Sequence, residues 1–265
     1  MTSATNSASQ FENVAQHYDL LMTGVPYEDW VVYVKQLLDT RGAHPKTVLD
    51  LACGTGNVSA LLAEEGFEVV GVDIAPLMIE EAKRKAEAEG REIEYLVQDA
   101  AVMDLGERQF DLCISLFDSL NYITDPERLA MAIVRIAHYV RAGGLFIFDL
   151  NSEFALKNHF FDQDNLSYPE ERLQYDWKST YDESTRICRV DMDFSYRDDA
   201  EQVTPFKEVH LQFAYRKDEI LKMLDDAGFE DVTFYQAYTL RLPTRTADRV
   251  YYVARRTATP QAARD

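Results

Sequence analysis

The chain has 265 residues and a formal net charge of −19 at pH 7, and this length suits one large domain, or one domain with a substantial insertion. So acidic a surface repels phosphate backbones and anionic membranes, and neither nucleic acid nor a membrane is therefore an expected partner. No apolar run approaches the ~18 residues of a membrane span. The cysteines, Cys53, Cys113 and Cys188, include no CxxC pair, which disfavours a disulfide framework or a zinc site and favours a cytoplasmic location.

Short apolar strands alternate with helices along most of the chain. Residues 1–10 and 258–265 are polar and are predicted to be disordered tails. Between them the pattern predicts, in order, a helix over 26–39, a strand over 48–51, a helix after a glycine turn, a strand over 68–72, a helix over 76–89, strands over 93–97 and 110–116, a helix over 126–141 and a strand over 145–150. Such alternation indicates a parallel sheet that is covered on both faces.

The pattern changes over residues 155–215. Apolar and polar residues alternate there in three segments, 172–177, 189–196 and 208–215. In the last segment the predicted buried face carries Val209, Leu211 and Phe213. Period-two alternation predicts antiparallel strands with one apolar face each. The alternation of helices and apolar strands then resumes with a helix and two strands, near 232–238 and 249–255. We therefore predict one domain with an inserted sheet.

The stretch VLDLACGTGNVSALL, residues 48–62, places a glycine turn between a strand and a helix. Such a turn favours ligands with polar or anionic groups. It lacks the lysine and hydroxyl that a phosphate-binding loop requires. A dinucleotide fingerprint needs a third glycine, where this chain has Ser59. NAD stays open as a less favoured alternative, because Asp73 at the end of the second strand suits the ribose of NAD or of another adenosine ligand.

Acidic residues follow successive strands at the edge where open α/β sheets bind ligands. They are Asp50, Asp73 and Asp99. An acid at the position of Asp99 can accept a hydrogen bond from an adenine amino group. Three carboxylates around one pocket suit a cationic, amine-bearing ligand better than a pyrophosphate. S-adenosylmethionine, which combines a sulfonium, an ammonium group and an adenosine, fits this description.

Five segments resemble, in order, the motifs of class I S-adenosylmethionine-dependent methyltransferases: LDLACGTG, VVGVDIAPLMIEEAK, LVQDA, FDLCISL and VRAGGLFIFDL. The resemblance spans roughly residues 46–151. It implies an α/β fold with a Rossmann-like, doubly wound, mostly parallel seven-stranded sheet. Residues 11–154 and 216–257 would form this cofactor-binding domain, and residues 155–215 an inserted antiparallel β-sheet lid that covers the substrate.

The resemblance also implies where the cofactor lies. Gly54 and Gly56 would make room for its methionine part, and Ala52 replaces the family's usual first glycine. Asp73 would hold the ribose, and Asp99 would read the adenine edge. The full set of expected cofactor-binding residues is Tyr18, Asp50, Ala52, Gly54, Gly56, Asp73, Ile74, Met78, Asp99, Ala100 and Phe117.

Within the family, the segment AQHYDLLM and the inserted sheet resemble the branch of glycine and amino-sugar N-methyltransferases. This resemblance implies that Tyr18 closes over the cofactor and that the stretch LFDSLNYI faces the acceptor. In the amino-sugar enzymes a histidine near the end of that stretch handles the acceptor, whereas this chain has Tyr122 there. The expected reaction is methyl transfer to a small molecule, with nitrogen slightly favoured over oxygen as the acceptor atom.

Three residues are candidates for the chemistry: Tyr18, Asp118 and Tyr122. Methyl transfer depends mostly on positioning and desolvation, and a base is needed only for a protonated acceptor. Asp118 would orient or deprotonate an amine, and Tyr122 would offer its oxygen or its ring face. Asn121, together with Trp177 and Tyr196 at the rim of the inserted sheet, is expected to bind the acceptor. The competing interpretation of the 118–122 loop is that it only caps the next helix.

Several alternatives stay open. A metal-dependent, catechol-type enzyme would use Asp118, Asp149 and Asn151, but we expect the last two to point to opposite sides of their strand, and no metal site is predicted. His138 and His210 are interpreted as surface or boundary histidines. A cofactor-binding protein without transferase activity remains a further alternative. We expect a monomer or a homodimer.

Overall fold

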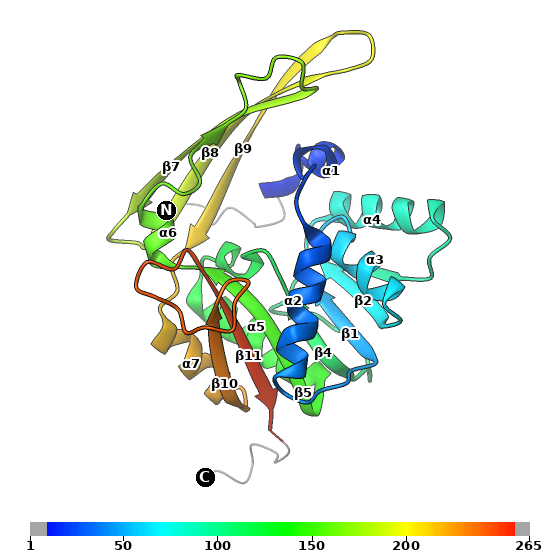
Figure 1. Ribbon diagram of the computed structural model, residues 1–265, viewed down its shortest axis with the longest axis vertical. Coiled ribbons are helices and arrows are strands. Elements are labelled where there is room, and N and C mark those ends of the chain that lie inside the picture. Colours follow the sequence, from blue (N-terminus) through cyan, green and yellow to red (C-terminus); the bar gives the residue numbers. More distant parts are fainter. Residues whose placement is uncertain (1–9, 258–265) are drawn as a thin grey trace.

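The computed structural model describes residues 10–257 (Figure 1). In chain order its elements are η2 (Ala15–His17), α1 (Tyr18–Leu21), α2 (Tyr27–Asp39), β1 (Thr47–Leu51), α3 (Asn57–Glu64), β2 (Glu68–Asp73), α4 (Pro76–Ala88), β3 (Glu94–Val97), β4 (Phe110–Ser115), η3 (Ser119–Tyr122), α5 (Pro126–Tyr139), β5 (Val140–Asn151), α6 (Glu153–Lys157), β6 (Gln163–Asp164), β7 (Leu173–Asp182), β8 (Ile187–Arg197), β9 (Val203–Phe213), α7 (Lys217–Asp226), β10 (Phe229–Gln236) and β11 (Arg249–Arg256). Residues 1–9 and 258–265, predicted as tails, lie outside the described residues. Between residues 10 and 257, no helix is both long and apolar enough to cross a membrane.

The main sheet has seven strands in the order β10-β11-β5-β4-β1-β2-β3. Strands β3, β2, β1, β4 and β5 are parallel neighbours, whereas β11 runs antiparallel to both β5 and β10. The strand order reverses where the chain passes from β3 to β4, so the carboxyl ends of β1 and β4 flank a topological switch point. The predicted α/β fold with a mostly parallel, seven-stranded, doubly wound sheet is confirmed.

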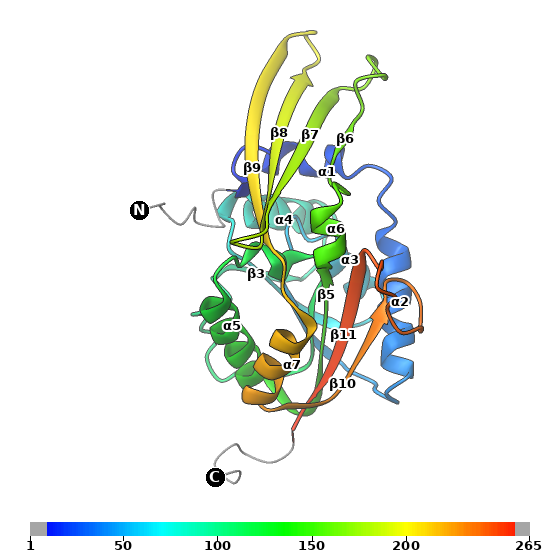
Figure 2. The same cartoon turned by 90° about the vertical axis from the view of Figure 1, so that its left-hand side faces the viewer.

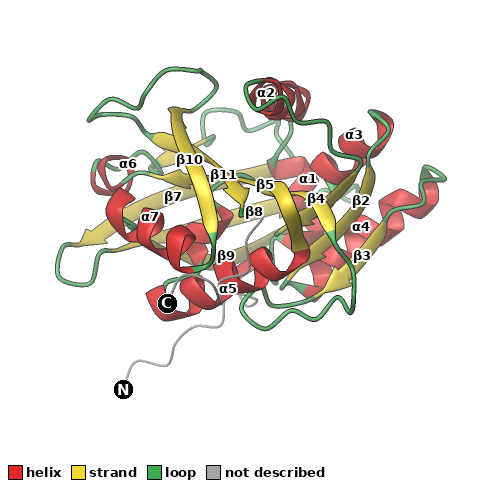
Figure 3. Ribbon diagram, turned by 90° about the horizontal axis from the view of Figure 1, so that it is seen from below, coloured by secondary structure: helices red, strands yellow, loops and turns green. Residues whose placement is uncertain are grey.

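Helices cover both faces of this sheet, because successive residues of a strand point to opposite sides. On β5, Leu145 and Ile147 pack in one apolar cluster with α2 and α3, whereas Phe146 and Phe148 pack in another with α5 and α7. Figure 3 shows these two helix pairs on opposite sides of the strands. A strand with two buried faces is mostly apolar, which is why the central parts of β4 and β5 contain the short apolar runs LCI and LFIF.

A second, antiparallel sheet contains β6, β7, β8 and β9 and is called the inserted sheet below. It rises above the carboxyl ends of the parallel strands (Figure 2). Val190 and Met192 of β8 pack against Val14 of the amino-terminal segment and Met78 of α4. The apolar face of the inserted sheet is therefore buried partly by the start of the chain, and the predicted antiparallel sheet is confirmed.

The predicted buried face of β9 is wrong at Val209 and Leu211, although Phe213 is buried as predicted. Glu208, His210 and Gln212 point inward, with exposed fractions of 5%, 4% and 2%, whereas Val209 and Leu211 are only partly buried. Alternation shows that a strand has two faces, but apolar character does not identify the inner face when the inner side chains are polar and hydrogen-bonded.

The amino-terminal segment packs on β9. Gln10, which was predicted to belong to the tail, is buried, and its Oε1 accepts a hydrogen bond from the backbone N–H of Leu211 at 2.6 Å. The backbone N–H groups of Asn13 and Val14 donate to Glu208 at 2.7 and 2.9 Å. These bonds hold the segment that leads into α1 against the inserted sheet.

Candidate active site

A cavity of about 920 Å³ lies between the carboxyl ends of β1, β2 and β4 and the inner face of the inserted sheet. This volume falls within the ~300–1,000 Å³ that is usual for small-molecule sites. Most of the residues predicted from the sequence line it: Tyr18, Asp50, Ala52, Gly54, Asp73, Ile74, Met78, Asp99, Ala100, Phe117, Asp118, Tyr122 and Trp177. Gly56, Asn121 and Tyr196 are not among the lining residues.

The turn after β1 takes left-handed backbone conformations at three positions, with φ of 60° at Ala52, 54° at Gly54 and 80° at Gly56. A side chain at Gly54 would enter open space, so the absent Cβ leaves room on the cavity side. A side chain at Gly56 would instead collide with the Tyr95 ring. The second glycine therefore permits close packing and a left-handed helix start rather than lining the cavity.

Two buried carboxylates lie at the carboxyl ends of β1 and β2. Asp50 accepts a hydrogen bond from Ser59 Oγ at 2.5 Å, and burial raises its pKa to about 7. Asp73 accepts from the backbone N–H of Gly54 at 2.9 Å and of Ala75 at 2.8 Å, and burial raises its pKa as well. Each carboxylate oxygen of Asp73 has a further lone pair, so the side chain can hold the turn and still accept bonds from a ligand.

Asp99, after β3, is also partly engaged. One of its oxygens accepts from the backbone N–H of Ala101 at 2.9 Å, and the other forms an ion pair with Arg128, which lines the cavity too. A ligand amino group at Asp99 would therefore share this carboxylate with a guanidinium.

Asp19 fixes the amino-terminal helix over the turn, a role that the sequence did not reveal. It accepts from Thr55 Oγ1 at 2.6 Å and from Asn57 Nδ2 at 3.0 Å, both next to the glycine turn, and it pairs with Lys85 Nζ at 2.6 Å. These bonds join α1 to α3 and α4. They place Tyr18, the preceding residue, in the wall of the cavity.

The loop after β4 is held in a strained conformation by a buried carboxylate. Phe117 and Asp118 both have left-handed backbones, with φ of 64° and 52°. Their N–H groups donate to the two oxygens of Asp149 at 2.7 and 2.9 Å. Arg249 of β11 pairs with Asp149 at 2.5 Å and with Asp118 at 2.6 Å. This network offsets the backbone strain, which usually persists only where surrounding contacts require it.

Both carboxylate oxygens of Asp118 already accept hydrogen bonds from side chains of the fold. Arg249 occupies Oδ1, and Gln212 Nε2 donates to Oδ2 at 2.7 Å. Burial raises the pKa of Asp118 to about 6, against the opposing charge of Arg249. Its position favours an electrostatic and structural role in the loop over direct deprotonation of an amine.

Asn121 is fully buried and connects β5 to β9. Its Nδ2 donates to the backbone oxygens of Asn151 and Phe213 at 3.2 and 3.0 Å, and its Oδ1 accepts from the N–H of Asn151 at 2.9 Å. With these bonds made inside the fold, the predicted contact between Asn121 and the acceptor finds no support.

The expectation that Asp149 and Asn151 diverge is also wrong, because residues two apart on a strand share a face. Both side chains reach the network around Asp118, Asp149 through Arg249 and Asn151 through a 3.0 Å bond to Gln212. Across residues 10–257, no group of three or more acidic, histidine or cysteine side chains could hold a metal ion.

His210 is buried, whereas the sequence was interpreted as placing it at the surface or at a boundary. Its Nδ1 lies 3.2 Å from Tyr122 Oη, and its Nε2 lies 2.8 Å from Glu208 Oε2. Both His210 and Tyr122 line the cavity. The sequence contains a signal for this cluster, since Glu208, His210 and Gln212 alternate along β9 and therefore share one face.

The two rim residues of the inserted sheet differ. Trp177 lines the cavity, and its buried indole Nε1 has no hydrogen-bond partner among the described residues. Tyr196 lies toward the far end of the sheet, where its ring stacks on His17 at 4.1 Å and its Oη accepts from Arg172 at 2.9 Å. Only Trp177 stands where a cavity ligand would touch it.

Comparison with known proteins identifies the family. A model described as a methyltransferase domain matches residues 48–144. The protein named "Putative methyltransferase GWCH70_2453", from Geobacillus sp. (strain WCH70), is 32% identical over 248 residues, 93% of this chain and 99% of that protein. The crystal structure of an S-adenosylmethionine-dependent methyltransferase from Clostridium acetobutylicum ATCC 824 aligns with a TM-score of 0.81 and 26% identity, over 94% of this chain and 99% of that one. The chain belongs to the S-adenosylmethionine-dependent methyltransferases.

The predicted enzyme class and cofactor are thereby confirmed. The methyltransferase is also similar to the sugar N-methyltransferase KedS8 from Streptoalloteichus sp. ATCC 53650, with a TM-score of 0.73 and 25% identity over 91% of this chain and 92% of that one. The open space at Gly54 and the carboxylates at Asp50 and Asp73 fit a cationic nucleoside. When bound, S-adenosylmethionine supplies a methyl group on a positively charged sulfur.

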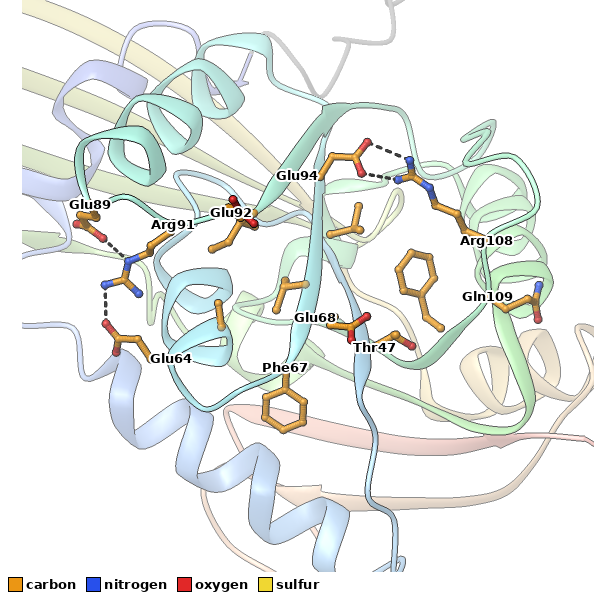
Figure 4. Close-up of a pocket in the computed structure, with 15 residues that line it drawn as sticks. Thr47, Glu64, Phe67, Glu68, Glu89, Arg91, Glu92, Glu94, Arg108 and Gln109 are labelled. Atoms are coloured by element: carbon orange, nitrogen blue, oxygen red, sulfur yellow. Dashed lines mark hydrogen bonds and ion pairs between the residues drawn. The ribbon is translucent and has the colours of Figure 1, made fainter.

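A second hollow lies at the opposite edge of the sheet, near the amino ends of β1 to β4. Figure 4 shows Arg91 and Arg108 turned toward neighbouring glutamates. Arg91 pairs with Glu64 at 2.5 Å and Glu89 at 2.6 Å, and Arg108 pairs with Glu94 at 2.9 Å. Both arginines of this hollow are thus paired with glutamates, and the larger cavity remains the candidate active site.

Proposed function

We propose that the protein transfers the methyl group of S-adenosylmethionine to a small molecule, and to an amine nitrogen in preference to oxygen. The observation that carries this proposal is the continuity of one cavity from the glycine turn to the inserted sheet. Cofactor and acceptor would meet inside it, shielded from water as methyl transfer requires.

The cofactor would occupy the parallel-sheet side. Asp73 accepts the ribose hydroxyls, and Asp99 with Ala100 reads the adenine, whose ring lies beside Ile74 and Met78. The space beside Gly54 takes the methionine part. Tyr18, held by its neighbour Asp19, covers the cofactor from the amino-terminal side.

The acceptor would occupy the inserted-sheet side, which is aromatic and apolar. Tyr175, Trp177, Met192 and Phe194 line it. Aromatic faces attract a cationic amine, and this supports nitrogen over oxygen, as does the similarity to a sugar N-methyltransferase. The unpartnered Nε1 of Trp177 supports a ligand with a hydrogen-bond acceptor, because buried donors are nearly always paired.

The test is conversion of S-adenosylmethionine to S-adenosylhomocysteine with matched amines and alcohols, followed by mass spectrometry of the products. We expect N-methylated products to dominate. Tyr18→Phe and Tyr122→Phe each remove one oxygen, so folding should survive. At least one of them should lower turnover with little change in cofactor affinity, since the loss falls on transition-state positioning. Exclusive O-methylation would contradict the acceptor assignment, and full turnover by both variants would exclude the hydroxyls from the reaction.

A further inference from the structure

Two titratable residues are buried beside the acceptor side of the cavity and have no role in cofactor binding. Glu208 and His210 lie two positions apart on β9, with exposed fractions of 5% and 4%. Burial of such groups costs free energy unless each has a partner. The partners of this pair therefore indicate what it does.

Glu208 is held as a hydrogen-bond acceptor. Its Oε1 accepts the backbone N–H groups of Asn13 and Val14 at 2.7 and 2.9 Å. Its Oε2 lies 2.8 Å from His210 Nε2, which accordingly donates to it. A neutral imidazole with its proton on Nε2 has a free lone pair on Nδ1.

Tyr122 extends this chain of hydrogen bonds into the cavity. Its Oη lies 3.2 Å from His210 Nδ1 and donates to it, which leaves the oxygen lone pairs available to a ligand. The ring of Phe11 packs 4.6 Å from that of His210 and 5.3 Å from that of Tyr122. Burial raises the pKa of Tyr122, so its hydroxyl stays protonated and can donate its proton to His210 as it accepts one from a ligand.

We propose that Glu208, His210 and Tyr122 form a relay that takes the proton of the methyl acceptor, an inference that rests on the proposed function. The acceptor's lone pair forms a bond to the methyl carbon, and the carbon–sulfur bond breaks with its electron pair staying on sulfur. The acceptor's proton moves to Tyr122 Oη as the Tyr122 proton moves to His210 Nδ1. The Glu208 carboxylate stabilises the imidazolium that forms.

The relay defines the acceptor class. The acceptor must carry both a lone pair and a proton on the atom that is methylated, as a neutral primary or secondary amine or a hydroxyl does; an ammonium group would first have to lose a proton. Asp118 is not part of this relay, since its oxygens accept hydrogen bonds from Arg249 and Gln212 and not from Tyr122 or His210.

Other groups that face the relay also affect the pH dependence of the reaction. The charged and titratable ones are Tyr18 of α1, Asp118 after β4 and Arg249 of β11. Burial raises the pKa of Asp118 to about 6, so Asp118 could also produce a change in rate near that pH. A pH limb that belongs to the relay must disappear when His210 is replaced.

The kinetic test uses the full chain, benzylamine as the acceptor probe and S-adenosylhomocysteine as the readout. His210→Asn and Glu208→Gln should each lower kcat roughly 100-fold, the usual size of a lost proton transfer, and His210→Asn should also abolish the limb of the pH profile that belongs to the relay. Their affinity for S-adenosylmethionine should stay within a few-fold by calorimetry, which also checks folding. His138→Asn, on the exposed side of α5, is the matched control and should keep wild-type kinetics.

A second measurement needs no acceptor. Nitrogen NMR of the imidazole should place the proton on Nε2 of His210 in the wild type. In Glu208→Gln the new amide donates to Nε2, so the proton should move to Nδ1. A wild-type proton on Nδ1, or a His210→Asn variant with unchanged kcat and pH profile, would overturn the relay. If the wild type methylates no amine or alcohol while the NMR result holds, the proposed function fails and the relay geometry stands.

Discussion

The two sides of the cavity are built from contacts between residues that lie at different separations along the sequence. On the cofactor side, Asp73 binds the N–H of Gly54, 19 positions away, and of Ala75, two positions away. On the acceptor side, His210 contacts Tyr122 across 88 positions and Gln212 contacts Asp118 across 94. The first side can be predicted from short segments of sequence, whereas the second exists only after the inserted sheet has packed.

This difference has a functional meaning. The cofactor side consists of strand ends and a turn, which the fold supplies by itself. The acceptor side depends on where β9 places its polar residues, so acceptor recognition can change without disturbing the turn. We therefore expect variants on the two sides to separate cofactor affinity from acceptor kinetics, and the first prediction concerns the network between them.

The largest effect is expected at Arg249, which neutralises two buried carboxylates. Arg249→Met should lower the free energy of unfolding by ~3–5 kcal/mol, because Asp118 and Asp149 stay buried without their partner. Urea unfolding measures this loss, with the exposed Arg245→Met as the control. Adding Asp118→Asn should recover part of the stability. A loss no larger than that of the control would show that the network is not structural.

A smaller effect is expected for the cofactor at Asp73. Asp73→Ala should weaken S-adenosylmethionine binding by roughly 2–4 kcal/mol, because charge-assisted hydrogen bonds to the ribose are lost. Asp73→Asn keeps the shape of the side chain and separates the lost charge from damage to the turn. Unchanged affinity by calorimetry in a folded variant would reject the ribose assignment.

The pH dependence of stability should show the burial of Asp50. Burial raises its pKa from 3.8 to about 7, so the folded protein binds this proton more tightly than the unfolded chain does. Stability should therefore fall as pH rises between about 4 and 7, by at most ~1.4 kcal/mol per pH unit. Asp50→Asn cannot titrate and should lose this contribution. The free energy of unfolding of both proteins would be measured at pH 5, 6, 7 and 8. The same change with pH in both proteins would contradict the assignment.

No binding to nucleic acid is expected. With a net charge of −19, the protein should show no salt-sensitive binding to bulk tRNA or duplex DNA at moderate ionic strength. Filter binding at two salt concentrations measures this. Sub-micromolar binding to tRNA would contradict a small-molecule acceptor.

Much of the fold could be predicted because local patterns determine it. The apolar strands, the glycine turn and the acids that follow the strands required no knowledge of distant partners. The roles of Arg249 and Gln212 could not be predicted, since their meaning lies in contacts with residues about a hundred positions earlier. His210 was misinterpreted for the same reason: a polar residue on an alternating strand reads as exposed until its partners are known.

Trp177 gives the most direct test that the two sides act separately. It lines the acceptor side, whereas Tyr196 on the same sheet stacks on His17 outside the cavity. We predict that Trp177→Leu raises the acceptor KM or lowers kcat while S-adenosylmethionine affinity, measured by calorimetry, stays within a few-fold. Tyr196→Leu should change only the melting temperature. Wild-type acceptor kinetics in Trp177→Leu, or a loss of cofactor affinity as large as that of Asp73→Ala, would contradict the account.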